Sequence, residues 1–351
     1  MHEITVMNIA IKFIILSTFL FAHSGCAAQQ EEKQICAVAF YNLENLFDPA
    51  DDPLKFDEDF TPNGANKYTE KIYRKKLHNM AYAISQLALD KTPDGPALIG
   101  VAEVENKKVL TDLVNEPELM QRKYNIAHFE SPDARGIDVG FLYQAKYFKL
   151  ITAKAIKVNI NSEFKKEQTR DVLYVTGILA KDTVYVLVNH WPSRREGTNN
   201  SDWKRMNAAT ANKQIIDSLI AKNKHAKIIV MGDFNDNPTD QSVSVGLQAK
   251  AEKTNMQNTE LFNPFAKLYK QGLGTAVYKN NWDMFDQIMV SKGLVMANGN
   301  GWQLQGQEIF NAKFLQNPFG KMKGNPHRSF SGNRFIDGFS DHFPVIIYLT
   351  Q

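Results

Sequence analysis

Short apolar segments rich in β-branched residues recur along the whole chain, separated by polar or helical stretches. This alternation limits the fold more than any single motif does, because strands interspersed with helices predict an α/β sandwich in which helices cover buried sheets. Two stretches have helical periodicity, one behind a candidate N-cap at Thr69 and one behind Ser201 or Asp202. The predicted strands are 35–42, 97–104, 138–143, 172–179, 183–191, 227–235, 285–291 and 343–349.

Residues 30–351 are predicted to form one domain, because no repeat, low-complexity tract or Pro/Gly/Ser-rich linker divides them. A hydrophobic content of 43% and a charged content of 23% are ordinary for a globular protein. The formal net charge of +3 is too small to identify a nucleic-acid binder by electrostatics alone. Basic clusters at 71–76, 193–196 and 321–328 are each interpreted as solvated surface.

The first residues are typical of a signal peptide. Residues 13–22 follow Lys12 and form an apolar run in which only Ser17 and Thr18 are polar. This run is too short to span a bilayer and fits the hydrophobic region of a signal peptide. We therefore predict a signal peptide over residues 1–28 and export of the mature chain.

The two cysteines have different expected roles. The sequence Ser-Gly-Cys ending at Cys26 resembles the end of a bacterial lipobox, although His23 stands where an aliphatic residue is usual. We expect lipidation of Cys26, which would attach the protein to a membrane in the bacterial periplasm, at the outer membrane or on the cell surface. Secretion after cleavage near Ala28 is the alternative, and a buried hydrophobic N-terminus is a third reading. Cys36 is interpreted as a small buried hydrophobic residue.

Polar side chains stand where the predicted strands begin or end. Five of them follow an apolar run and three precede one. If all of them meet at one edge, the last two strands must run antiparallel to the earlier ones, which predicts mixed sheets. The side chains at strand ends are Asn42, Glu103, His190, Asp233 and Asn235, and those at strand starts are Asp286, Asp341 and His342.

The four carboxylates in this set offer oxygen ligands without thiolates, which favours Mg²⁺ or Mn²⁺ over zinc. A single carboxylate at a strand end is more often a turn former, and only the joint placement favours a metal site. His342 could be held by Asp286 as in a catalytic triad, and His190 could donate to an anionic ligand.

The segment Lys-Ile-Ile-Val-Met-Gly-Asp-Phe-Asn at 227–235 shows how a strand end could carry such groups. Gly232 is expected to let the backbone turn. Alternation along the strand end is expected to place Asp233 and Asn235 on one face, two residues apart.

Seven motifs in order resemble those of the endonuclease/exonuclease/phosphatase superfamily, the fold of pancreatic deoxyribonuclease. They are FYNLENLFD, GVAEVEN, RGIDVGFLY, VNHWPSRREG, GDFNDNP, FDQIMVS and SDHFPV, and they cover nearly all of residues 36–349. The resemblance implies a four-layer α/β sandwich in which two mixed β-sheets pack face to face with helices outside.

The resemblance also implies a metal site. Glu103 would be the principal ligand of Mg²⁺, or of Mn²⁺. Asn42 would lie beside it, contacting metal-bound water or phosphate. Asp341 would complete the acidic cluster near this metal or a second one. Arg135 and Arg194 are candidate substrate contacts, with a surface arginine as the alternative for each.

The remaining motif positions imply catalytic roles. Asp233 would orient and deprotonate the attacking water, while Asn235 would donate to the phosphate. His190 and His342 would stabilise the pentacovalent phosphorane, with Asp286 holding His342. The base role stays open between Asp233 and His342.

The expected function is an exported, Mg²⁺-dependent phosphodiesterase that acts as a nuclease on DNA or RNA. Gln287 stands where inositol polyphosphate 5-phosphatases carry an arginine, which disfavours that subfamily. A phosphatase or a lipid-headgroup phosphodiesterase resembling sphingomyelinase is the alternative, and a surface lipoprotein that binds without turnover is a further one. No protein partner is implied, and a monomer is the default.

Overall fold

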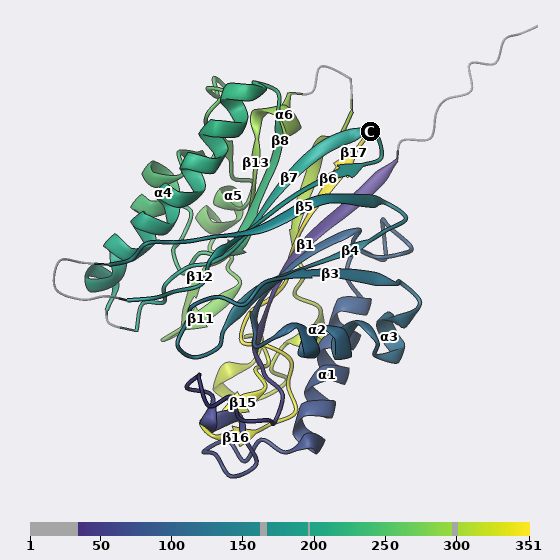
Figure 1. Ribbon diagram of the computed structural model, residues 1–351, viewed down its shortest axis with the longest axis vertical. Helices are drawn as coiled ribbons and strands as arrows, with labels where there is room; N and C mark the ends of the chain where they lie inside the picture. Colours follow the sequence, from purple (N-terminus) through teal and green to yellow (C-terminus); the bar gives the residue numbers. More distant parts are fainter. Residues whose placement is uncertain (1–33, 162–166, 196, 297–300) are drawn as a thin grey trace, which may run out of the picture. The chain divides into compact units, whose positions relative to one another are not determined.

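Two large mixed β-sheets form the centre of the fold (Figure 1). The computed structural model describes residues 34–161, 167–195, 197–296 and 301–351. In spatial order the first sheet contains β14 (Gln303–Ile309), β17 (Val345–Thr350), β1 (Ile35–Leu46), β2 (Leu98–Val104), β4 (Asp138–Gln144) and β3 (Tyr124–His128). The second contains β5 (Phe148–Ile156), β6 (Val172–Leu179), β7 (Asp182–His190), β8 (Lys227–Asp233), β13 (Asp286–Ser291), β10 (Leu261–Phe262) and β9 (Ala249–Lys250).

The helices lie outside the sheets. The longer ones are α1 (Glu70–Ser85), α2 (Lys107–Val114) and α4 (Thr198–Lys222), and the shorter ones are α3 (Pro117–Met120), α5 (Phe265–Lys270) and α6 (Lys292–Val295). Short helical turns span Glu58–Phe60, Ser242–Gly246, Lys313–Leu315 and Gly320–Met322. Two small hairpins complete the fold, β11 (Ala276–Tyr278) with β12 (Asn281–Asp283) and β15 (Phe330–Ser331) with β16 (Arg334–Phe335).

Three apolar clusters define four layers. One cluster fills the space between the sheets and joins Phe40 of the first sheet to Met231 and Ile288 of the second. Another packs α1 and α2 on the outer face of the first sheet, and the third packs α4 on the outer face of the second (Figure 1). This arrangement confirms the predicted four-layer sandwich of two mixed sheets.

The strand directions agree with the prediction made from the polar residues. β17 is antiparallel to β1, and β13 is antiparallel to β8, whereas β1 pairs with β2 and β7 with β8 in parallel. The helix predicted behind Ser201 or Asp202 begins earlier, at Thr198, with Gly197 as its N-cap. Ser201 therefore lies inside the helix, where its hydroxyl donates to the carbonyl of Gly197 at 2.9 Å.

The contacts of Gln34–Gln351 form one compact unit. The predicted signal peptide at 1–28 and the predicted lipidation at Cys26 lie outside the described residues. Among the helices of the described chain, none is both long and apolar enough to cross a membrane.

Candidate active site

Three adjacent strands of the second sheet bring polar side chains to one edge. The parallel pairing of β7 with β8 sets His190 opposite Asp233. The antiparallel pairing of β8 with β13 sets Asp233 opposite Asp286. Neighbouring strands lie about 5 Å apart, so this register alone places the three side chains within reach of one another.

The first sheet contributes Asn42 and Glu103 from the parallel strands β1 and β2. The register of this pair shifts after Asn42, and Glu103 adopts a left-handed backbone conformation with φ of +59° at the irregularity. A glutamate in this region is uncommon and indicates a backbone held by its surroundings. The Glu103 carboxylate accepts a hydrogen bond from the backbone N–H of Asn45 at 2.9 Å.

The two sheet edges meet around the carboxylate of Asp233. Its Oδ2 accepts a hydrogen bond from Asn42 Nδ2 at 3.0 Å and lies 3.7 Å from His190 Nε2. His190 Nε2 lies equally far, 3.7 Å, from Glu103 Oε1. Asn42, His190 and Asp233 are buried, whereas the Glu103 side chain is 19% exposed. The cluster is therefore reached from solvent on the side of Glu103.

The second histidine completes the site from the segment just before β17. His342 Nδ1 lies 2.6 Å from Asp286 Oδ2, and its other ring nitrogen lies 4.0 Å from Asp233 Oδ2. The same Nε2 atom is 3.9 Å from Asp341 Oδ1. A buried carboxylate behind one ring nitrogen leaves the other free to donate toward a ligand.

The surroundings give the two histidines opposite charge states. Burial and then the nearby guanidinium of Arg170 hold the pKa of His190 well below its usual value. Burial also acts to lower the pKa of His342, but the carboxylates of Asp286 and Asp233 outweigh it and leave that pKa well above its usual value. These directions favour a neutral His190 and a protonated His342.

Burial raises the pKa of Asp233 to about 7, against the opposing charge of His342. A carboxylate with a pKa near neutrality can accept a proton at the pH at which it operates. The position and the pKa of this group both suit a general base.

The chemistry of the donor set fits a hard divalent cation. One ligand atom from each of Glu103, His190 and Asp233 lies within 4.8 Å of the others, and the group faces solvent through Glu103. Two carboxylates in a partly dry site repel each other, and a cation placed between them removes that repulsion. Glu103 is the part of the site suited to hold a divalent metal ion, whereas Asp341 is paired with Arg328 at 2.8 Å and is not part of this group of ligand atoms.

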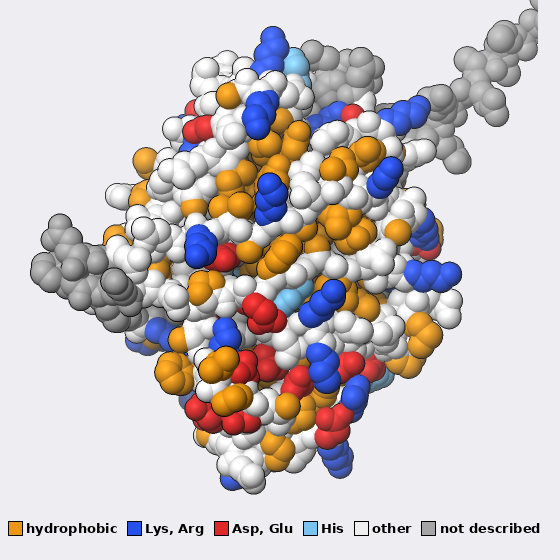
Figure 2. Space-filling view, in the orientation of Figure 1, with side chains coloured by type: hydrophobic (Ala, Val, Ile, Leu, Met, Phe, Trp, Pro, Cys, Tyr) orange, Lys and Arg blue, Asp and Glu red, His pale blue; other side chains and the backbone are white. Residues whose placement is uncertain are grey.

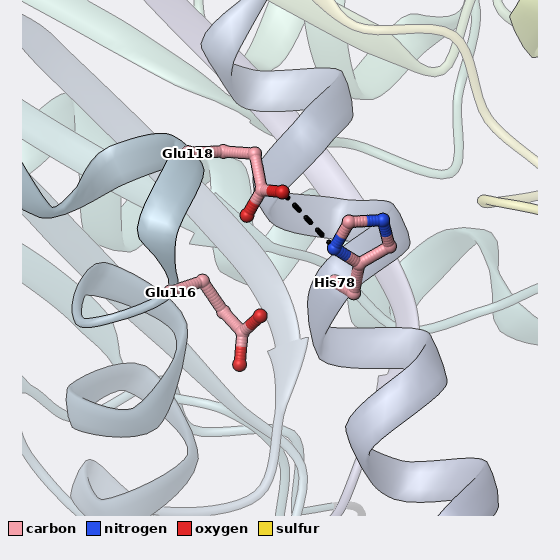
Figure 3. Close-up of side chains that lie close together, drawn as sticks. All are labelled: His78, Glu116 and Glu118. Atoms are coloured by element: carbon pink, nitrogen blue, oxygen red, sulfur yellow. Dashed lines mark ion pairs between the residues drawn. The ribbon is translucent and has the colours of Figure 1, made fainter.

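A further group of metal-type ligands lies on the outer helices. His78 Nδ1 of α1 is 3.1 Å from Glu118 Oε1 of α3, and the carboxylate of Glu116 points into the same gap (Figure 3). This group stands on the helices that cover the first sheet, not at the strand ends. A third such group pairs buried His128 with Asp138 at 3.0 Å.

Asn235 is placed differently from the prediction. β8 ends at Asp233, and Asn235 lies beyond the strand with a left-handed φ of +49°. Strand alternation therefore does not set its side chain, and the predicted alternation was wrong. Its backbone N–H donates to Asp233 Oδ1 at 2.9 Å, while its Nδ2 donates to the carbonyl of Trp191 at 3.1 Å.

The two predicted substrate arginines differ in their contacts. The Arg194 guanidinium donates to the backbone carbonyl of Asn235 at 2.7 Å and to Asp236 at 2.9 Å. These contacts hold the loop after β8, so the Arg194 guanidinium has a structural role in this conformation. Arg135 is only partly buried, and its Nε lies 3.4 Å from Asp133 Oδ1.

Two buried charged groups, Lys76 and Glu44, and the exposed Arg328 beside them were not identified from the sequence. Lys76 of α1 is fully buried and donates to the carbonyl of Glu44 and, at 2.9 Å, to Ser329 Oγ. The Glu44 carboxylate in turn accepts from the backbone N–H of Ser329 at 2.6 Å. Arg328 follows on, donating to Asp341 at 2.8 Å. The reading of 71–76 as solvated surface is therefore wrong for Lys76, whose position in an apolar helical face was the available signal.

The fold and the site together define a class of protein, the hydrolases of phosphoric esters that are built on two packed mixed sheets. More narrowly, the chain belongs to the Endonuclease/Exonuclease/phosphatase family, which it matches over residues 37–351. This membership confirms the resemblance drawn from the seven motifs. The comparison with curated proteins finds no match.

Solved structures share the fold at low sequence identity. Truncated TDP2 from Caenorhabditis elegans is 16% identical with a TM-score of 0.53, over 90% of this chain and 98% of that one. An endonuclease/exonuclease/phosphatase family protein from Bacteroides thetaiotaomicron is 14% identical with a TM-score of 0.53, over 91% and 96%. TDP2 from D. rerio, complexed with single strand DNA product, is 13% identical with a TM-score of 0.53, over 90% and 99%.

Proposed function

We propose that this protein is an exported, divalent-metal-dependent phosphodiesterase that hydrolyses DNA or RNA. The observation that carries the proposal is the placement of Asp233 between two histidines in opposite charge states, His190 and His342. Such a site offers a base for water and donors for an anionic transition state at the same time. The TDP2 relative bound to single strand DNA product supports a nucleic acid as the substrate class.

The side chains divide the work of in-line attack by water on phosphorus. Asp233 accepts a proton from the water through Oδ2, with Asn42 Nδ2 holding that carboxylate in place. His342 presents its Nε2–H to a phosphoryl oxygen, and Asp286 keeps the ring oriented and charged. A Mg²⁺ or Mn²⁺ ion held by Glu103 would supply positive charge to the phosphate group.

The bond from phosphorus to the leaving oxygen breaks as the bond to water forms, and the leaving oxygen takes up a proton. His190 is neutral and can present Nε2–H to the phosphoryl oxygens without competing for the proton of the attacking water. The assignment of the base to Asp233 rests on its pKa near 7. The raised pKa of His342 favours the form that is protonated on both ring nitrogens, which has no lone pair to accept a proton from water.

The test is turnover by residues 30–351 with Mg²⁺ and with chelator. Plasmid DNA, RNA, bis-p-nitrophenyl phosphate, p-nitrophenyl phosphate and sphingomyelin are offered to the wild type and to Asp233→Asn. Cleavage of nucleic acid that is lost with chelator and falls at least 10²-fold in Asp233→Asn is expected. Activity that survives both changes contradicts the proposal, and cleavage of the monoester alone would support a phosphatase instead.

Export and attachment to a membrane form a separate part of the proposal, supported by the apolar run at 13–22 and the lipobox-like end at Cys26. Mass analysis of the mature N-terminus from the native host tests it. A diacylglyceryl group on Cys26 is expected. An intact N-terminus would exclude export by this signal, and a mature chain beginning after Cys26 would indicate secretion.

A further inference from the structure

The face shown in Figure 2 carries its acidic side chains mostly in the lower part, while lysines and arginines are scattered over the whole face. This face has no broad cationic patch, and a net charge of +3 is small for a nucleic-acid binder. Recognition of phosphate groups must then come from local clusters of cations.

One such cluster lines a pocket of about 210 Å³ beside the end of β7. Its floor is the buried guanidinium of Arg170, which donates to the carbonyls of His190 at 3.1 Å and Trp191 at 2.5 Å. The pocket therefore adjoins the backbone that carries a catalytic histidine. Its other cationic lining residues are Arg135, Arg195 and Lys204.

Among the described residues at this pocket, cations outnumber carboxylates. Arg170 is paired with Asp133 at 3.0 Å, and Lys204 is paired with Glu167. Arg135 shares the same Asp133 at 3.4 Å. Within the described ranges, four cations thus stand with two carboxylates. Arg195 is exposed, and none of the ion pairs within the described part of the chain includes it.

The pocket also contains an unsatisfied donor. Thr169 lines it and is only 2% exposed, yet its Oγ1 has no hydrogen-bond partner among the described residues. Nearly all buried hydroxyls in proteins are paired, so an unpaired one beside cations indicates a missing acceptor. This hydroxyl is closed to solvent, so an anionic oxygen bound by the guanidinium groups would reach it only after a small shift of the pocket wall.

We propose that this pocket binds a second, non-scissile phosphate group of the substrate, next to the phosphate at Asp233. The inference rests on the proposed phosphodiesterase function and narrows its substrate to molecules with two neighbouring phosphates, of which a nucleic acid strand is the one we favour. Arg195 and Thr169 act as specificity determinants, while Arg170 positions the end of β7. Arg135 lines the same pocket beside Asp133 and would contact the second phosphate from that side.

The experiment compares two substrates that release the same p-nitrophenolate. Bis-p-nitrophenyl phosphate has one phosphate, and the p-nitrophenyl ester of a dinucleotide has a second phosphate beside the first. The measured quantity is the ratio of kcat/KM for the dinucleotide ester to kcat/KM for the simple diester. This ratio is compared in the wild type, Arg195→Gln, Thr169→Val and the control Arg74→Gln, an exposed arginine on α1.

We expect the ratio to fall about tenfold in Arg195→Gln, through KM, and less in Thr169→Val, with no change in Arg74→Gln. The dependence of log kcat/KM on log salt for the dinucleotide ester should become shallower by about 0.7 in Arg195→Gln. A ratio that is equal in all four proteins contradicts the proposal that this pocket binds a second phosphate and leaves the phosphodiesterase proposal intact. Failure of the wild type to cleave either substrate overturns the phosphodiesterase proposal instead.

Binding measured without turnover keeps the pocket testable in that last case. Inorganic phosphate, a dinucleotide and an inositol bisphosphate are titrated by calorimetry into the wild type and Arg195→Gln with chelator present. Weaker binding to the variant supports the pocket, and the tighter of the two organic ligands identifies the source of the second phosphate. Equal binding to both proteins contradicts it.

Discussion

Asp286 Oδ2 lies 2.6 Å from His342 Nδ1, although the two residues are 56 positions apart and come from different sheets. Asp286 begins β13 in the second sheet, and His342 precedes β17 in the first. The contact forms only when the two sheets are packed together. The geometry of the candidate site therefore depends on the packing of the two sheets, and changes in that packing reach the site directly.

Replacing Asp286 with Asn should remove the negative charge at this contact while keeping the shape of the side chain. The amide can still approach the ring, but it no longer offsets the burial that lowers the pKa of His342. We expect this pKa to fall, and turnover at pH 7 to drop on the order of 10²–10³-fold. NMR titration of His342 in metal-free protein and kcat measurements check the two effects. Asp283→Asn, on the neighbouring hairpin, is the control, and equal losses in both variants would contradict the assignment.

The site was largely predictable because its residues stand at the ends of strongly apolar strands. The polarity pattern placed polar groups at strand ends and required antiparallel last strands if these groups share one edge. The structure brings five of them together, namely Asn42, Glu103, His190, Asp233 and Asp286. This works because the ends of buried strands must meet water or a ligand.

The longer strands that were missed have mixed polarity, and the others have only two or three residues. β5 and β14 contain many residues that are half-buried or exposed, since they lie at or near sheet edges, and β3 has only five residues. Their sequences show no continuous apolar run. The buried pairing of Lys76 with Ser329 was also out of reach, because it joins residues 253 positions apart.

Gly232 shows a second kind of limit, and it yields a prediction. The sequence reading assigned this glycine to a turn, but it lies inside β8, opposite Asn189 of β7. A Cβ at Gly232 would lie 2.4 Å from the backbone carbonyl oxygen of Asn189, which cannot move without separating the two strands. Gly232→Ala should therefore displace His190 from Asp233. We expect a loss of about 1–3 kcal/mol in the free energy of unfolding and at least a tenfold loss of activity.

Urea unfolding and kcat/KM measurements test this prediction against Gly306→Ala. A Cβ at Gly306 would meet nothing within 4 Å, so this variant should retain both stability and activity. If the two alanine variants behave alike, the close approach of β7 and β8 does not control the site.

Cys36 should be inert in the folded protein. It is buried in β1, and burial raises the pKa of its thiol to about 12. Because the thiolate is the reactive form, almost none is present at pH 8 and the side chain is out of reach. Residues 30–351 should therefore react with a thiol reagent only after denaturation, when one thiol is expected. Rapid labelling of the native protein would show that β1 opens or that Cys36 is not where the structure places it.

Lys76 and Lys75 are neighbours on α1 and provide a matched pair for the last prediction. Lys76 is fully buried and links the carbonyl of Glu44 to Ser329, whereas Lys75 is 44% exposed and lies 3.4 Å from Asp337 Oδ1. Breaking a buried charged interaction by removing one partner typically lowers the free energy of unfolding by about 3–5 kcal/mol. A surface ion pair contributes only about 0–1 kcal/mol. Lys76→Met should therefore destabilise the protein by about 3 kcal/mol and Lys75→Met by less than about 1 kcal/mol.

Lys76→Met should also lower the activity, because Ser329 is hydrogen-bonded to Glu44, and Arg328 beside it donates to Asp341. Loss of Lys76 frees the segment that carries Arg328 and Ser329, and Arg328 contacts Asp341, the neighbour of His342 in the sequence. Activity should then fall in Lys76→Met under conditions where the protein is still folded, as judged by circular dichroism. If Lys76→Met is destabilised but fully active, Lys76 contributes to stability alone. If it is as stable and as active as the wild type, the buried contact contributes nothing to the fold.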